Sequence, residues 1–230
     1  MVTTAGAEDT VTGGVSGRPT DAIIDLLGAL AYGELSAFDH RAEDARMAPT
    51  LAARAKLSAV AATEFEHHCR LSDRLGELGA TPEDAMAPFV AAVETYHALT
   101  EPATWAEAVV KAYVGDGLAA DFYREIAAYT DAGTAALISG VLDEGGRGEF
   151  AVSEVRRELG ERPGEAGRLA LFARRLVGEA ISQTQHVLAD RDSLTALLLA
   201  GRQTTVGLPA LFARLTERHG ERMAALGLGN

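Results

Sequence analysis

Four long segments of this sequence each carry an apolar stripe at helical spacing, and one acidic residue lies near the middle of each stripe. Residues three and four positions apart share one face of a helix, so each stripe predicts one buried helix face. The stripes consist of Leu27, Leu30, Glu34, Phe38, Arg41 and Ala45; Leu57, Val60, Glu64, His67, Leu71 and Leu75; Val109, Tyr113, Asp116, Ala120, Tyr123 and Ala127; and Leu137, Val141, Glu144, Arg147, Ala151 and Val155. Such a chain is expected to fold as packed helices whose core contains carboxylates.

These stripes predict an all-α protein, because almost no segment shows the alternation typical of a strand. We expect helices at residues 20–47, 49–78, 82–99, 102–129, 131–159, 165–189, 191–200 and 208–226. Two long helices, a shorter connecting helix and two more long helices are typical of a four-helix bundle with one crossover connection. We expect the helix at 165–189 and the C-terminal pair to pack outside this bundle.

Composition and charge limit the kind of protein further. The first 17 residues are small, polar and glycine-rich, so we expect a flexible tail at 1–17 and a single helical domain at 18–230. One cysteine, Cys69, excludes an internal disulfide and favours the cytoplasm. We expect neither a membrane span nor a secretory signal. The net charge of −12 disfavours general adhesion to nucleic acid or anionic membranes.

Carboxylates that meet in one core need cations, because burying one unpaired ionised carboxylate costs several kcal/mol. Divalent metals meet this need, since carboxylates and imidazoles ligate them directly. Glu64 and His67 stand three residues apart and point the same way from one helix. Glu34 precedes Glu64 by 30 residues and Asp116 precedes Glu144 by 28, which places the acids of the two hairpins at nearly the same height. All five residues are therefore candidate metal ligands.

Each candidate also has an ordinary structural interpretation. A single buried acid can be protonated or paired with a nearby arginine, and Glu-x-x-His spacing often arises by chance. Asp116 lies between Gly115 and Gly117, a position that also suits a kinked helix. The coincidence of all four stripes, rather than any one residue, favours a metal site.

The segments KAYVGDGLAADFYREIA and LFARRLVGEA, together with these acids, resemble the ferritin-like superfamily of carboxylate-bridged di-iron proteins. The likeness covers about residues 20–200, and within the superfamily the chain looks like an actinobacterial branch similar to tRNA methylthio-isopentenyladenosine hydroxylase. The resemblance implies a ferritin-like bundle in which two helices each supply a Glu and two others each supply Glu-x-x-His. It makes Glu34 the first-helix ligand and assigns Glu64 and His67 to the first Glu-x-x-His. It places Asp116 at the third-helix Glu, with Glu144 opening the second Glu-x-x-His.

The second Glu-x-x-His is broken, because Arg147 stands where the histidine belongs. A guanidinium stays protonated and cannot ligate iron. If Arg147 points inward, it pairs with Asp116 and Glu144 and leaves the other three ligands as a site for one metal or for none. If Arg147 points outward, a di-metal site survives with one ligand replaced by water. The cofactor would be iron or manganese, since both accept this ligand set.

Two functional classes follow. The resemblance implies an iron-dependent hydroxylase or oxidase that acts on a modified adenosine in tRNA or on another small molecule. Binding of tRNA phosphates needs local positive charge, which Arg156, Arg157, Arg174 and Arg175 supply only if they cluster in space. The alternative is a non-catalytic helical scaffold whose polar core is sealed by Arg147. We expect a homodimer.

Overall fold

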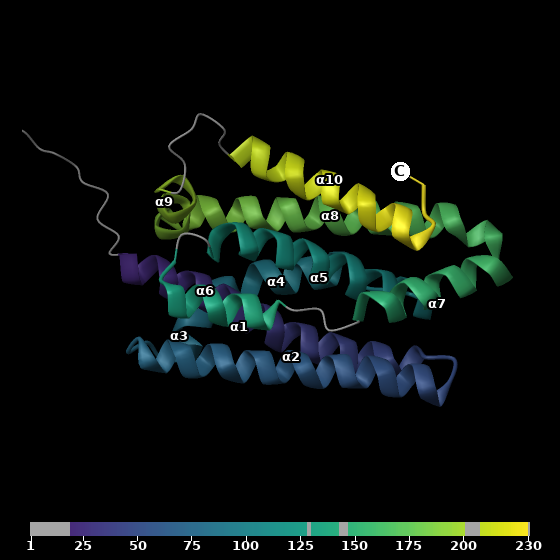
Figure 1. Cartoon of the computed structure of the whole chain (residues 1–230), viewed down its shortest axis with the longest axis horizontal. Helices are drawn as coiled ribbons and strands as arrows, with labels where there is room; N and C mark the ends of the chain where they lie inside the picture. The colour runs from purple at the N-terminus through teal and green to yellow at the C-terminus, as the bar shows by residue number, and fades with distance from the viewer. Residues whose placement is uncertain (1–18, 128–129, 143–146, 201–207, 230) are drawn as a thin grey trace, which may run out of the picture.

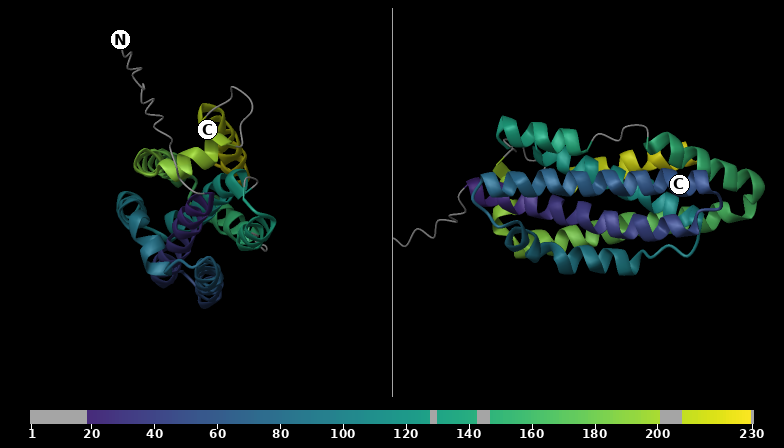
Figure 2. Two further views of the ribbon diagram at one scale, coloured as in Figure 1. Left: turned by 90° about the vertical axis from the view of Figure 1, so that its left-hand side faces the viewer. Right: turned by 90° about the horizontal axis from the view of Figure 1, so that it is seen from below.

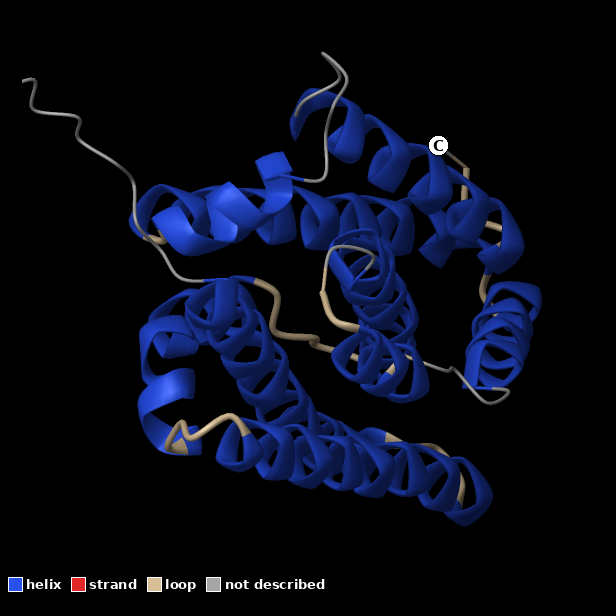
Figure 3. Ribbon diagram, turned by 60° about the vertical axis from the view of Figure 1, so that its left-hand side comes forward, coloured by secondary structure: helices blue, strands red, loops and turns tan. Residues whose placement is uncertain are grey.

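The structure, a computed structural model, describes residues 19–127, 130–142, 147–200 and 208–229, and these contain helices and no strand (Figure 3). The all-α prediction is therefore confirmed. The expected tail at 1–17 and Glu144 lie outside the described residues. The α-helices are α1 (Pro19–Asp44), α2 (Leu51–Glu77), α3 (Pro82–Met86), α4 (Val90–Leu99), α5 (Trp105–Ala127), α6 (Ala132–Val141), α7 (Arg147–Glu161), α8 (Ala166–Asp190), α9 (Asp192–Ala200) and α10 (Leu208–Leu226).

Helices α1 and α2 form an antiparallel hairpin, and the two run side by side over most of their length (Figures 1 and 2). Thr50 caps α2, because its side chain accepts a hydrogen bond of 3.1 Å from the backbone nitrogen of Ala53. Gly79 follows the end of α2 with φ of 78°, a conformation that glycine adopts without strain. Local signals in the sequence therefore define both ends of α2.

Helix α5 occupies the centre of the molecule. It contacts α1, α7, α8 and α10, and Figure 1 shows it between the α1–α2 pair and the α8–α10 pair. Arg41, near the end of α1, is paired with Asp116 in the middle of α5, while Leu30 and Ile126 share one apolar cluster. Residue numbers therefore rise along α1 as they fall along α5, so the two helices are antiparallel.

The helix expected at 131–159 is two helices, α6 and α7, with residues 143–146 between them outside the described residues. Asp131 begins α6, and its carboxylate accepts a hydrogen bond of 3.0 Å from the backbone nitrogen of Thr134. Gly145 and Gly146, which follow Glu144, disfavour a continuous helix at this point.

The helix expected at 165–189, outside the bundle, is α8, and it takes part in the core. Helix α8 packs against α4 and α5 and buries seven of its residues. Leu169, Phe172, Ala173 and Leu176 recur at helical spacing on its buried face. Because that apolar stripe is as strong as those of the other long helices, α8 belongs to the core and leaves no sharp boundary between bundle and extra helices.

Two apolar clusters form the core, and polar residues lie between them. Leu30 and Leu71 belong to one cluster, whereas Ala45 and Leu57 belong to the other. Along both α1 and α2 the buried stripe therefore passes from one apolar cluster to the other, and Glu34 and Glu64 fall between these ends. Within the described part of the chain, no helix has the length and apolar character needed to cross a membrane.

Candidate metal centre

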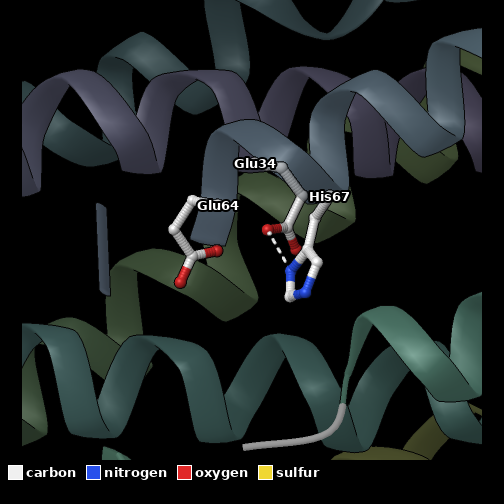
Figure 4. A group of neighbouring side chains, drawn as sticks. All are labelled: Glu34, Glu64 and His67. Carbon is white, nitrogen blue, oxygen red and sulfur yellow. Dashed lines mark hydrogen bonds and ion pairs between the residues drawn. The ribbon is translucent and has the colours of Figure 1, made fainter. Parts of the chain in front are cut away.

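Two neighbouring helices bring three of the expected ligands together. Glu34 lies on α1, and Glu64 and His67 lie one turn apart on α2. The Nδ1 atom of His67 lies 3.2 Å from the Oε2 atom of Glu34 (Figure 4). One ligand atom from each of the three residues can be chosen so that all lie within 4.8 Å of one another. We call Glu34, Glu64 and His67 the triad.

The triad fits a first-row transition metal in donor type and in size. Bonds from such an ion to carboxylate oxygen or imidazole nitrogen are about 2.0–2.2 Å long, so two ligand atoms on one ion lie up to about 4.4 Å apart. The ligand atoms of the triad lie within 4.8 Å of one another, which is close to this limit. Glu64 and His67 are only 4% and 6% exposed, so the ligands are largely shielded from water.

A cation of the chain itself also lies at this centre. Arg41, seven residues after Glu34 on α1, is buried, and its Nη1 atom lies 3.3 Å from the Oε1 atom of Glu64. Its Nη2 atom pairs with the carboxylate of Asp116 on α5. Arg41 stood on the predicted stripe of the first helix, but nothing in its spacing indicated that it would meet carboxylates from two other helices.

The remaining candidates are placed differently. Asp116 is joined to the triad through Arg41 and is not part of the group whose ligand atoms converge. Glu144 lies outside the described residues, as does the side chain of Arg147, so the roles expected for them stay predictions. His68, the residue after His67, is not part of the triad; its Nδ1 lies 2.9 Å from the carbonyl oxygen of Ala31, a contact that ties α2 to α1.

A second polar group lies nearby and was not expected from the sequence. The rings of His40 on α1 and His97 on α4 stack with their centroids 3.9 Å apart. Burial lowers the pKa of His97 to about 2, so this imidazole is neutral. Burial also lowers the pKa of Lys111 on α5 to about 8 and raises the pKa of Asp44 to about 6. One signal was available: Lys111 follows Val109 and Val110 in an otherwise apolar part of α5.

A cavity of about 290 Å³ adjoins both polar groups. Glu34, Arg41 and Glu64 line it, and so do the residues of the second group. Most of its other described lining is apolar and comes from α1, α5, α8, α9 and α10, including Leu26, Leu30, Phe122, Ile126, Ile181 and Leu188. The site therefore combines buried metal ligands with an apolar space beside them.

Comparison with known proteins agrees with this architecture. A family model described as a ferritin-like domain of actinomycetes matches residues 17–201. A solved structure of a protein from Synechococcus, described as having aldehyde deformylating oxidase activity, is similar with a TM-score of 0.71 and 18% identity. The match covers 93% of each chain, and at that identity it supports the fold alone. No curated protein sequence matches the chain.

Proposed function

Since this chain belongs to the family of ferritin-like domains of actinomycetes, we propose that it is a metal-dependent oxidoreductase whose metal is held by Glu34, Glu64 and His67. One observation carries the proposal: two carboxylates and an imidazole converge in a shielded place beside an apolar cavity. Oxygen and nitrogen ligands of this kind suit iron or manganese. When bound, such an ion would supply redox chemistry with dioxygen.

The residues of the chain have separate tasks in this proposal. The triad holds the ion, and the interaction of His67 with Glu34 fixes the orientation of the imidazole. Arg41 compensates the charges of Glu64 and Asp116 and keeps both carboxylates in place without a second metal. The apolar lining of the cavity excludes water and leaves room for an apolar part of a substrate next to the ligands.

A second function is favoured by the position of Arg41. A buried guanidinium paired with two carboxylates can stabilise the core without any metal, as in a non-catalytic helical scaffold. In such a scaffold Arg41, rather than the expected Arg147, would neutralise the buried carboxylates. The two functions differ in metal binding, since a scaffold of this kind takes up no ion.

Metal binding by chelator-treated protein, titrated with ferrous and manganous ions without oxygen, tests the proposal. We expect uptake of about one ion per chain together with a higher unfolding temperature. Glu64→Gln should weaken binding at least about tenfold, because even the loss of an outer partner of a metal ligand costs about 10- to 100-fold. Glu66→Gln, an exposed position two residues away, is the matched control and should bind as the wild type does.

Two results would contradict the oxidoreductase. The first is no uptake of either ion by the wild-type protein, and the second is equal uptake by wild type and Glu64→Gln. If the ion binds, oxygen consumption on addition of ferrous iron and a reductant should exceed that of Glu64→Gln. An uptake of two ions per chain would require ligands beyond the triad and would support the di-metal form of the centre.

A tRNA substrate, a homodimer and a cytoplasmic location stay predictions. Two of the four arginines expected to bind phosphates, Arg156 and Arg157, already contact other groups of the protein. Arg157 pairs with Glu154 and Glu161, and the Nε atom of Arg156 donates a hydrogen bond of 2.8 Å to the carbonyl oxygen of Ala225. These contacts reduce the positive charge available to a phosphate backbone.

A further inference from the structure

One end of the cavity carries polar atoms that lack partners. The Nζ atom of Lys111, the hydroxyl of Tyr96 and the Nδ1 atom of His97 are buried and have no hydrogen-bond partner among the described residues. All three residues line the cavity, and Lys111 is only 6% exposed. The three side chains come from α4 and α5, so this end of the cavity is built where two helices meet.

These atoms are too numerous in one place to be incidental. A buried polar group without a partner costs about 1–3 kcal/mol, and such groups are rare in folded proteins. Nine buried side-chain atoms of the described residues have no hydrogen-bond partner, and three of them belong to Tyr96, His97 and Lys111. Two more belong to Arg41, whose guanidinium is held by ion pairs with Glu64 and Asp116. Because those four residues surround a single cavity, a ligand bound there would satisfy several of them at once.

The unsatisfied donors at this end of the cavity favour a head group that accepts hydrogen bonds. Arg41 is already paired with Glu64 and Asp116. Lys111 forms no ion pair within 4.0 Å among the described residues; Asp44, which also lines the cavity, attracts its charge only from beyond that distance. The ring of Tyr96, 5.7 Å from the Nζ atom, gives only a weak cation–π contact. A hydroxyl and a neutral imidazole in its Nδ1–H form complete a set of donors. A monoanion with two acceptor oxygens would give Lys111 the contact partner that Asp44 does not provide, and it would accept hydrogen bonds from the two neutral donors.

The rest of the cavity selects an apolar body. Leu26 and Leu30 on α1 share one apolar cluster with Phe122 and Ile126 on α5, and α8 adds Val187 and Leu188. The lining positions of α1 extend from Leu26 to Asp44, a length of about 27 Å along the helix axis. Since α1 and α5 are antiparallel, the polar residues gather at one end of this length and the apolar residues at the other.

We propose that the cavity binds an aliphatic carboxylate, a fatty acid, whose head group accepts hydrogen bonds from Lys111, Tyr96 and His97. Its hydrocarbon chain lies between α1, α5 and α8. The proposal goes beyond the proposed function and does not depend on it, because none of the three donors belongs to the triad. The acid would place its chain past Glu34 and Arg41, so the site and the metal centre share one space.

Calorimetric titration of chelator-treated, full-length protein with octanoate, dodecanoate and hexadecanoate tests this inference. The use of metal-free protein keeps the result independent of the metal proposal. We expect one acid to bind per chain, and dodecan-1-ol, which has the same chain length but no charge, to bind at least about tenfold more weakly than dodecanoate.

Three variants locate the head group. Lys111→Met should weaken dodecanoate at least about tenfold and leave dodecan-1-ol unchanged, and Tyr96→Phe should weaken the acid about threefold to tenfold. The chain has two lysines, and the other, Lys56, is exposed on α2, so Lys56→Met is a matched control that should bind as the wild type does. Circular dichroism checks that each variant is folded.

The inference is overturned if the wild-type protein binds none of the acids. It is also overturned if the alcohol binds as tightly as the acid, or if folded Lys111→Met retains the wild-type affinity for dodecanoate. Loss of acid binding in Lys56→Met would equally contradict it, because that lysine lies away from the cavity.

Discussion

Replacement of Arg41 by leucine tests the central electrostatic feature of this protein. The guanidinium is buried and pairs with carboxylates from two other helices, Glu64 on α2 and Asp116 on α5. Leucine keeps an apolar side chain in the core and removes the charge. The variant therefore removes both ion pairs while an apolar side chain still occupies part of the space.

The distances in the structure set the size of the effect. At 3.3 Å and an effective dielectric constant of about 20, the attraction between Arg41 and Glu64 is about 5 kcal/mol. The desolvation of both groups offsets part of it, and the side chain of Asp116 is 24% exposed, which screens the second pair. Removal of one member of a buried pair typically lowers the free energy of unfolding by about 3–5 kcal/mol. For a chain of this length that corresponds to a fall in Tm of roughly 6–20 °C.

The affinity of the triad for a metal ion should increase in Arg41→Leu, although the stability of the metal-free protein falls. Loss of a positive charge beside Glu64 removes a repulsion that any ion on the triad would meet, so metal-free Arg41→Leu should bind ferrous or manganous ions at least about tenfold more tightly, or 1.4 kcal/mol. An ion at 100 times its Kd adds about 2.7 kcal/mol to the free energy of unfolding, which would return much of the lost stability.

Urea unfolding followed by circular dichroism, with and without metal, measures both effects. Arg54→Leu, at an exposed position of α2, is the control and should lie within about 0.5 kcal/mol of the wild type. A metal-free Arg41→Leu protein within that same range would refute the buried ion pairs. Unchanged metal affinity in the variant would refute the electrostatic link between Arg41 and the triad.

Three further predictions concern other parts of the molecule. Gly28→Ala should lower the free energy of unfolding by about 1–3 kcal/mol, because the new Cβ would overlap the backbone carbonyl of Ala85. Gly33→Ala on the same helix has no atom within 4 Å of its new Cβ and should raise the free energy of unfolding by up to about 1 kcal/mol. Urea titration of both variants tests this difference. Burial lowers the pKa of Lys111 from 10.5 to about 8, so between these pH values the folded protein has released the Lys111 proton and the unfolded chain still holds it. The free energy of unfolding should therefore rise from pH 8 to pH 10.5. In Lys111→Met this rise should be absent, and the free energy of unfolding at pH 7 should be up to about 3 kcal/mol higher than in the wild type. Urea unfolding measured at several pH values checks both. Asp121→Asn removes a buried partner of two α10 arginines and should destabilise by about 3–5 kcal/mol, with faster proteolysis of α10 if that helix is released.

Much of the fold could be predicted because helix formation is read from local spacing. The ends of α2, for example, follow from Thr50 and Gly79, which act within a few residues of their own position. The convergence of Glu34 with Glu64 and His67 could be predicted for a similar reason, since a short connection makes α1 and α2 an antiparallel pair. Their metal binding stays a prediction.

The charge partners of the carboxylates could not be predicted from spacing. We assigned Asp116 to the metal and considered Arg147 as the sealing arginine, whereas the arginine that meets Glu64 and Asp116 in the structure is Arg41. Which side chains meet depends on how far α5 is shifted along α1 and how each helix is rotated about its axis. Neither quantity is encoded in the period of a single stripe.

The sequence by itself determined that this chain is helical, that its helices bury acidic residues, and that Glu64 and His67 point the same way, because these properties arise from residues within one or two helical turns. The tertiary structure alone decided which cation compensates the acids and that Lys111 faces a cavity rather than water. The physical reason is that buried charges are stabilised by neighbours brought close by helix packing, and packing geometry depends on all the helices at once.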